Sequence, residues 1–247
     1  MKMFCFQCEQ TAGGVGCTQG GVCGKKSITA NLQDKLTSSI IALAKCFKDN
    51  PNKEVSCLII KGLFITVTNV NFDDNVIQAF ISKIEEKIKA SNCANSSNFE
   101  SSEFSVNLIW QDEVNRRSLK SLILFGLRGM AAYSYHSLVL GYKDSEINKF
   151  FYEALNELTE DLTNDELLEL VLKTGRVNLK VMELLDKANA ESFGKPTPTK
   201  VSTNIEKEPF IVISGHDLKD LKELLEQTKD KGINVYTHGE MLPAHAY

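Results

Sequence analysis

The chain of 247 residues has little that would place it in a membrane or against nucleic acid. Its longest nearly apolar stretch, 57–70, is interrupted by Lys61 and three polar residues, and it falls short of the roughly 18 apolar residues of a spanning helix. The first residues lack the apolar run of a secretory signal. Basic residues do not outnumber acidic ones, since the formal net charge is -4. We therefore expect a cytoplasmic protein with neither a membrane nor a nucleic-acid partner.

Several common functional motifs are missing as well. The sequence has no glycine-rich phosphate loop, no Ser-His-Asp arrangement and no basic stripe interleaved with aromatic residues. A hydrophobic content of 43% excludes a collagen-like or low-complexity chain and is ordinary for a globular protein. The unusual feature is the placement of the cysteines.

Four of the seven cysteines lie within the first 23 residues: Cys5, Cys8, Cys17 and Cys23. Half of the residues from 13 to 24 are glycine, so this loop can wrap closely around a bulky group. In a reducing compartment such clustering indicates metal or redox chemistry rather than disulfides. The intervening lengths of 2, 8 and 5 residues favour an iron–sulfur cluster, because structural zinc sites use two tight Cys-x2-Cys pairs. A zinc site stays open as the alternative.

Apolar residues recur at spacings of three and four along most of the chain up to Gly194, which predicts a helical region. The stretch 55–70 is ambiguous, because it is rich in β-branched residues and also fits a helical stripe. The Ser/Asn-rich stretch 91–102 predicts a loop. Expected N-caps are Asp73, Asp144 or Ser145, and a capping box of Thr163 and Glu166. The expected helices cover about 32–47, 73–88, 112–142, 144–158 and 163–194.

The pattern changes after the proline-containing segment 195–199, and we place a domain boundary near residue 204. Phe210–Ser214 predicts a buried strand, Asp217 can cap a helix that ends near Gly232, and 233–237 predicts a second strand. One βαβ unit leaves both sheet edges unpaired, so we expect a second chain or further sequence to complete it. The predicted fold class is mainly α, with a helical domain in 1–204 and a truncated Rossmann-like α/β domain in 205–247.

Motifs spread along the whole chain carry a resemblance to a known family. They are Met3–Ala12 with Gly16-Cys17 and Cys23-Gly24-Lys25, Thr29–Asp34, Thr66–Phe72, Gly129–Tyr133, Val177–Leu185, Ser214–Leu218 and Val235–His245. This set closely resembles the N-terminal portion of the hybrid-cluster proteins, also called prismane proteins or hydroxylamine reductases.

The resemblance implies a fold and a chemistry. The fold would be a helical domain of two three-helix bundles followed by two α/β domains, with 55–70 helical. The four N-terminal cysteines would hold a 4Fe-4S cluster that receives electrons from a redox donor protein. A second, hybrid iron–sulfur–oxygen cluster would reduce hydroxylamine by two electrons to ammonia and water, a reaction of nitrogen metabolism.

The resemblance also limits what this chain can do. The histidine ligand of the hybrid cluster falls at His245, whereas the glutamate and cysteine ligands lie beyond residue 247. Cys46, Cys57 and Cys93 match no ligand and are interpreted as buried hydrophobes or incidental thiols. We therefore expect the chain alone to be inactive and to assemble no hybrid cluster. The alternative is a non-catalytic electron-transfer or assembly module, either a split-gene half or a truncated relic.

Other polar residues have a functional and a simpler interpretation. His238 and Glu240, with the segment 214–217, follow the two strands at the edge where open α/β sheets bind ligands. The simpler interpretation is polar loop groups, with Asp217 as a helix cap. His136 is interpreted as a packing histidine. The pairs Arg116-Arg117 and Lys25-Lys26 are typical of solvated faces, although Lys25 and Lys26 adjoin Cys23 and can bias a cluster there or steer an acidic donor.

Overall fold

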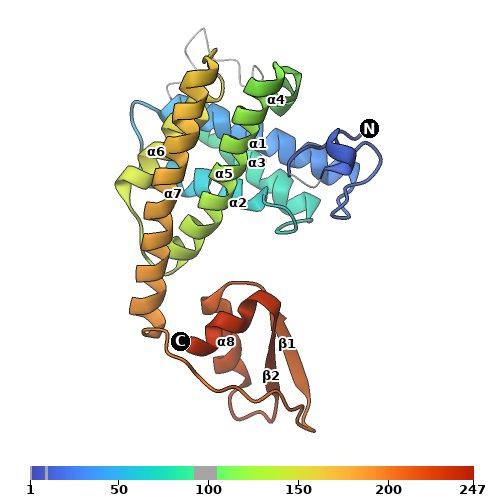
Figure 1. Cartoon of the computed structure of the whole chain (residues 1–247), viewed down its shortest axis with the longest axis vertical. Coiled ribbons are helices and arrows are strands. Elements are labelled where there is room, and N and C mark those ends of the chain that lie inside the picture. Colours follow the sequence, from blue (N-terminus) through green and yellow to red (C-terminus); the bar gives the residue numbers. More distant parts are fainter. Residues whose placement is uncertain (1, 9–10, 92–104) are drawn as a thin grey trace. The chain divides into compact units, whose positions relative to one another are not determined.

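The computed structural model describes residues 2–8, 11–91 and 105–247, and helices dominate them (Figure 1). No helix in these ranges combines the length and apolar character needed to cross a membrane. The predicted mainly α fold with a small, incomplete α/β unit is confirmed. The elements are η1 (Ala12–Gly14), α1 (Ser27–Phe47), α2 (Lys53–Ile65), α3 (Asp74–Lys89), α4 (Val106–Gln111), α5 (Val114–Val139), α6 (Ser145–Glu157), α7 (Asn164–Phe193), β1 (Phe210–Ser214), α8 (Leu218–Thr228), β2 (Asn234–His238) and η3 (Gly239–Ala246).

Side-chain caps start the helices where the sequence predicted them. The Asp73 carboxylate accepts hydrogen bonds from the first free amides of α3, and the Asp144 carboxylate does so for α6. At α7, Thr163 Oγ1 accepts from the Glu166 amide while the Glu166 carboxylate accepts from the Thr163 amide at 2.8 Å. These residues satisfy amides that have no partner inside a helix, so local sequence fixes the helix starts.

The predicted helix over about 112–142 corresponds to the continuous helix α5, whose ends lie two or three residues inside those bounds, whereas the short helix α4 before it was not predicted. Asp112 has an extended backbone (φ -68°, ψ 167°) between α4 and α5, and α5 ends at Val139. The Asp112 carboxylate accepts a hydrogen bond from the Glu113 amide and pairs with Arg116 and Lys120. Such local bonds compete with the helical ladder and explain the break.

The stretch 55–70 is helical only in part. It lies in α2 up to Ile65, where the amide and hydroxyl of Thr66 both turn back to the Leu63 carbonyl. The second strand starts one residue later than predicted, at Asn234. All of the predicted loop 91–102 except Ser91 lies outside the described residues.

The first of two compact units comprises 1–135 and 143–182. Here α1 packs against α2, α3 and α6, and α2 also contacts α3. Residues three and four apart along α3 (Ile77, Ile81, Ile84) are fully buried, as expected for one apolar face. A Cβ added at Gly126 of α5 would lie 3.1 Å from Thr174 Cγ2 of α7, and Lys173 and Lys180 of α7 pair with α6. The first unit therefore contains the helix sets α1–α3 and α5–α7.

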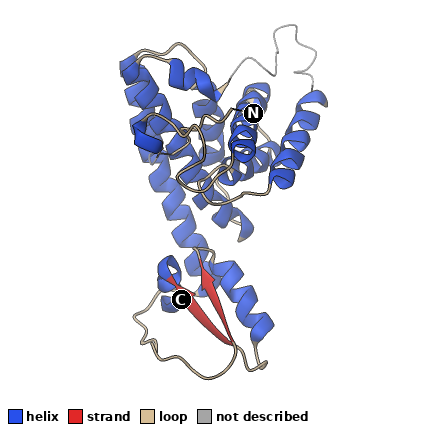
Figure 2. Ribbon diagram, turned by 90° about the vertical axis from the view of Figure 1, so that its right-hand side faces the viewer, coloured by secondary structure: helices blue, strands red, loops and turns tan. Residues whose placement is uncertain are grey.

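The second unit comprises 136–142 and 183–247. Its two strands are parallel, with Phe210 opposite Asn234 and Ser214 opposite His238, and α8 makes the crossover (Figure 2). Within the described residues no third strand joins them. Phe210 and Val212 remain 57% and 56% exposed. The unit is thus a βαβ with an uncovered apolar strand, and the domain boundary near residue 204 stays a prediction.

A glycine inside α2 generates a stability prediction. A Cβ on Gly62 would lie 2.7 Å from Ile40 Cδ1 and 3.1 Å from Phe80 Cε1, inside the helical core. We expect Gly62→Val to lower the free energy of unfolding by about 1 to 3 kcal/mol through overpacking. Urea unfolding followed by circular dichroism at 222 nm measures it.

The matched control is Gly129→Ala in α5, where an added Cβ meets nothing within 4 Å. This exposed site should gain about 0.5 to 1 kcal/mol from helix propensity. A Gly62→Val protein as stable as the parent would show that the α1–α2–α3 packing is looser than described.

Candidate functional site

Two of the four N-terminal cysteines are held side by side by the main chain. The Cys5 amide donates to the Cys17 carbonyl at 3.0 Å, and the Cys17 amide donates to the Cys5 carbonyl at 2.8 Å. Thr11 supports this antiparallel bridge, since its hydroxyl donates to the Cys5 carbonyl at 2.8 Å and lies 3.7 Å from Cys17 Sγ. Both cysteines are buried. The loop therefore positions these two thiols through its backbone.

The turn before Cys17 requires glycine. Gly16 has φ +107°, and a Cβ there would lie 2.4 Å from Phe4 Cε2. The Phe4 ring in turn packs edge-on against Trp110 of α4 at 5.3 Å, and Phe6 packs against the same indole at 4.9 Å. Because aromatic packing fixes Phe4 and Phe6, it also fixes the main chain on both sides of Cys5.

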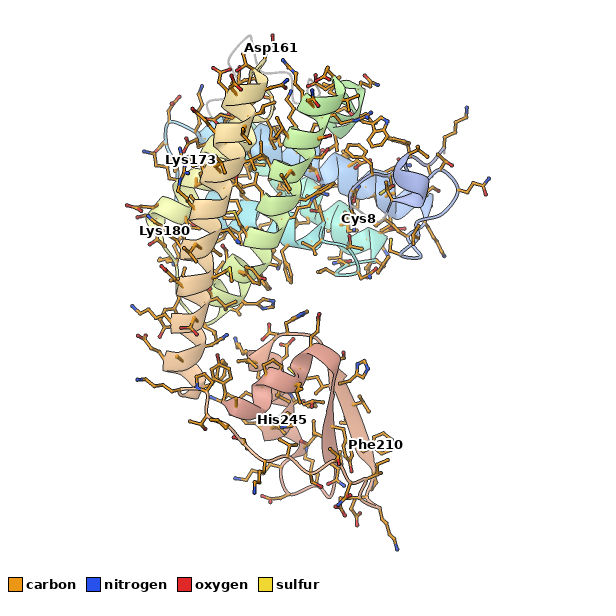
Figure 3. All side chains as sticks on the ribbon, in the orientation of Figure 1. Cys8, Asp161, Lys173, Lys180, Phe210 and His245 are labelled. Atoms are coloured by element: carbon orange, nitrogen blue, oxygen red, sulfur yellow. The ribbon has the colours of Figure 1, made fainter. Side chains whose placement is uncertain are left out.

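Cys8 and Cys23 are half-buried members of the same loop (Figure 3 labels Cys8). Within the described ranges, no three His, Cys, Asp or Glu side chains are arranged to hold a single metal ion. All four side chains are thiols, the ligand type that iron–sulfur clusters require, so the chemistry of the donor set fits such a cluster.

A network of buried polar groups lies beside the cysteines and centres on Gln7. Lys25 Nζ donates to Gln7 Oε1 at 3.0 Å, and Gln7 Nε2 donates to Asp34 Oδ1 at 2.5 Å. Arg128 of α5 donates to the Gln7 carbonyl at 3.0 Å and to Thr37 Oγ1 at 3.1 Å. Gln7, Lys25 and Arg128 are only 5%, 3% and 3% exposed. The segment between Cys5 and Cys8 is thereby tied to α1 and α5.

Burial shifts the ionisation of this network. Desolvation raises the pKa of Asp34 to about 6, against the opposing hydrogen bond from Gln7 and the charges of Arg128 and Lys25. Desolvation likewise raises the pKa of the Cys5 thiol. It lowers the pKa of Arg128 to about 10, so the guanidinium stays charged at neutral pH. Two buried basic side chains, Lys25 and Arg128, and the half-buried carboxyl of Asp34 therefore surround Gln7 near the cysteine loop.

Sequence reasoning missed Arg128 and misread Lys25. The interpretation of Lys25 as part of a solvated pair is wrong, because Lys25 is buried while Lys26 is exposed. The sequence did contain a sign of Arg128, which is the one charged residue in the otherwise apolar helical stretch 121–132. An isolated cation in an apolar helix face needs a buried partner.

The C-terminal histidines lie in separate contacts at the carboxyl ends of the strands. His245 Nε2 lies 2.7 Å from Thr237 Oγ1, and Figure 3 labels His245 in η3. His238 Nδ1 lies 3.1 Å from the Ser214 hydroxyl. These residues therefore lie at the predicted edge of the sheet, and each histidine has a different partner.

His216 and Glu240 form an exposed pair with 2.5 Å between Nε2 and the carboxylate. Asp217 caps α8, as predicted, by accepting from the Lys219 and Asp220 amides. Its other oxygen lies 3.2 Å from His136 Nδ1, and this hydrogen bond lowers the pKa of Asp217. His136 therefore supports the start of α8.

The remaining candidates have structural surroundings. Cys46 Sγ lies 3.0 Å from Ser91 Oγ, and Cys57 is half-buried in α2. Cys93 lies outside the described residues. Arg116 pairs with two aspartates, and the Arg117 guanidinium lies 4.7 Å from the centre of the Trp110 ring. Among the described residues, Cys46, Cys57, Arg116 and Arg117 lie outside the cysteine loop.

Comparison with known proteins gives a consistent result along the whole chain. A sequence model of the Prismane/CO dehydrogenase family matches residues 3–247. Proteins named hydroxylamine reductase are 43% identical in Methanocaldococcus jannaschii over 99% of this chain, and 43% and 44% identical in Acetivibrio thermocellus and Bacteroides thetaiotaomicron over 100% of it. The chain spans about half the length of these curated relatives, 49% of each. The chain therefore belongs to the Prismane/CO dehydrogenase family.

Proposed function

We propose that this chain is the electron-receiving portion of a hydroxylamine-reducing oxidoreductase, with a 4Fe-4S cluster on Cys5, Cys8, Cys17 and Cys23. The family implies iron–sulfur clusters, and its curated members compared above are named hydroxylamine reductase. The observation that carries the proposal is the cysteine loop itself. The main chains of Cys5 and Cys17 form a β-bridge on a glycine-rich turn, beside buried cations. When bound, such a cluster accepts and passes on single electrons.

The protein residues of the loop hold the ligands and limit access of water. The bridge and the Thr11 hydroxyl fix Cys5 and Cys17, both buried. Cys8 and Cys23 are half-buried and lie nearer the solvent. Val15 and Val22 of the same loop are 68% and 64% exposed. Exposed apolar groups beside half-buried ligands suit transient docking of a redox donor protein.

In this proposal the chain supplies one part of the catalytic centre. His245 is the first hybrid-cluster ligand, held through Thr237 in the second unit. The other ligands come from the portion of the relatives that this chain does not span. The exposed apolar surface of β1 supports a further sheet segment, in the same polypeptide or in a second one, packing there.

The first prediction concerns iron content. The chain purified anaerobically should be brown, with broad absorption near about 400 nm and about four irons. Cys8→Ser and Cys23→Ser should each reduce the bound iron several-fold, because each removes a thiolate ligand. Iron and zinc are measured together by plasma emission spectrometry.

The matched control is Cys57→Ser, which removes a half-buried thiol outside the loop and should leave iron content unchanged. A colourless protein with one zinc ion would instead support the zinc alternative. If Cys57→Ser lost as much iron as the loop variants, the assignment of the loop cysteines as iron ligands would be contradicted.

The second prediction concerns His245. His245→Ala should leave the iron content and the spectrum of the chain unchanged, because a single imidazole does not retain a multi-iron cluster. Loss of iron in this variant would mean that the chain binds more than the loop cluster.

The third prediction concerns turnover. The chain supplied with reduced viologen should not convert hydroxylamine to ammonia. A fusion to the second half of the Bacteroides thetaiotaomicron relative should do so, since it restores the missing ligands. Turnover by the chain alone would contradict the proposal that the other ligands of the catalytic cluster come from the part of the relatives that this chain does not span. A brown but inactive fusion would favour a non-catalytic electron-transfer module.

A further inference from the structure

Arg128 carries a buried hydrogen-bond donor that the described part of the chain does not use. Its two terminal nitrogens donate to the Gln7 carbonyl and to Thr37. Its Nε has no partner among the described residues, although the side chain is only 3% exposed. An unsatisfied buried donor on a charged group carries a large desolvation cost. Its presence indicates that a further acceptor belongs at this place.

The charges around Arg128 point to the same place. Its electrostatic partners are Asp34, Cys5 and Cys8, in that order. Lys25 is the second buried cation and interacts with Cys5 as well. Among the described residues, Asp34 is the one carboxylate that bonds within this network. Positive charge therefore exceeds negative charge among the described groups beside these two cysteines.

A surplus buried charge needs compensation, because isolated ions are costly inside a protein. Thiolates and the sulfides of an iron–sulfur cluster would provide both the negative charge and the hydrogen-bond acceptor. Net charge and hydrogen bonds near the sulfurs are the factors through which a protein sets the reduction potential of such a cluster.

We propose that Arg128, assisted by Lys25, is a positioning residue that raises the reduction potential of the cysteine-loop cluster by offsetting the charge of the thiolates at Cys5 and Cys8. This inference rests on the proposed function, since it requires a cluster on the loop. Arg128 acts in two ways: its terminal nitrogens fix the Gln7 main chain between these cysteines, and its charge favours the reduced cluster.

The size of the effect follows from the charge. At an effective dielectric constant of about 20, a unit charge within about 10 Å changes a one-electron equilibrium roughly tenfold. Arg128→Gln should therefore lower the ratio of reduced to oxidised cluster about tenfold at a fixed solution potential, equivalent to about 59 mV for one electron. Arg128→Lys retains the charge and should stay within about threefold of the parent.

The experiment is a mediated redox titration of the full 247-residue chain, followed by visible absorption and by electron paramagnetic resonance of the reduced cluster. Arg116→Gln is the matched control. It removes the same charge from the same helix, at a partly exposed position that pairs with Asp112 and Asp161. It should titrate like the parent, because distance and solvent screen its charge.

The possible outcomes distinguish a failure of this inference from a failure of the proposed function. A parent chain without a cluster contradicts the proposed function and the inference with it. A cluster in Arg128→Gln that titrates like the parent overturns the inference alone, and shows a purely structural role for Arg128. If Arg128→Gln fails to retain a cluster, Lys25→Gln decides. A lowered reduced fraction in Lys25→Gln supports the charge effect, and a parental ratio overturns it.

Discussion

The hydrogen bond from Arg128 to the Gln7 carbonyl is the contact on which the cysteine loop most depends. Among the described residues up to Lys26, the longest helix is the three-residue η1, so this part of the loop depends on contacts with other elements. Two sets of contacts attach it. The Phe4 and Phe6 rings lie against Trp110, and Gln7 receives hydrogen bonds from Arg128 and Lys25.

These two attachments differ in physical character. The aromatic contacts bury apolar surface and tolerate small shifts, whereas the Arg128 contacts are directional and join a charged donor to one carbonyl oxygen. In a loop held by both kinds of contact, the aromatic packing fixes how closely the loop lies against its neighbours. The hydrogen bonds fix which loop residue faces which partner. Two thiols on an otherwise irregular segment can then keep defined positions.

Much of the helical architecture was predictable because its determinants are local. Asp73, Asp144 and the Thr163–Glu166 box act within a single turn, and they start helices where the sequence placed them. The helical periodicity of α3 and α6 likewise follows from one buried face. The short helix α4 was not predicted, because its six residues are too few to show a helical period, and the extended backbone at Asp112 separates it from α5.

The candidate site was predictable in its residue types and not in its surroundings. The spacing of the four cysteines in the sequence was enough to predict that they form one set. The Cys5–Cys17 bridge could not be predicted, because it is a main-chain contact that does not depend on particular side chains. The roles of Arg128 and Asp34 depend on burial between elements distant in sequence. A lysine next to a cysteine reads as solvated, and only the packing of α1 and α5 around Gln7 shows that Lys25 is buried.

The exposed strand β1 has a consequence for handling the protein. Phe210 and Val212 lie on a two-stranded sheet whose outer hydrogen-bonding groups have no strand partner within the described residues. Open strand edges with apolar side chains are templates for pairing between molecules. At high concentration, self-association should therefore begin at 210–214 while the helical unit remains folded, so light scattering would increase before helical ellipticity decreases.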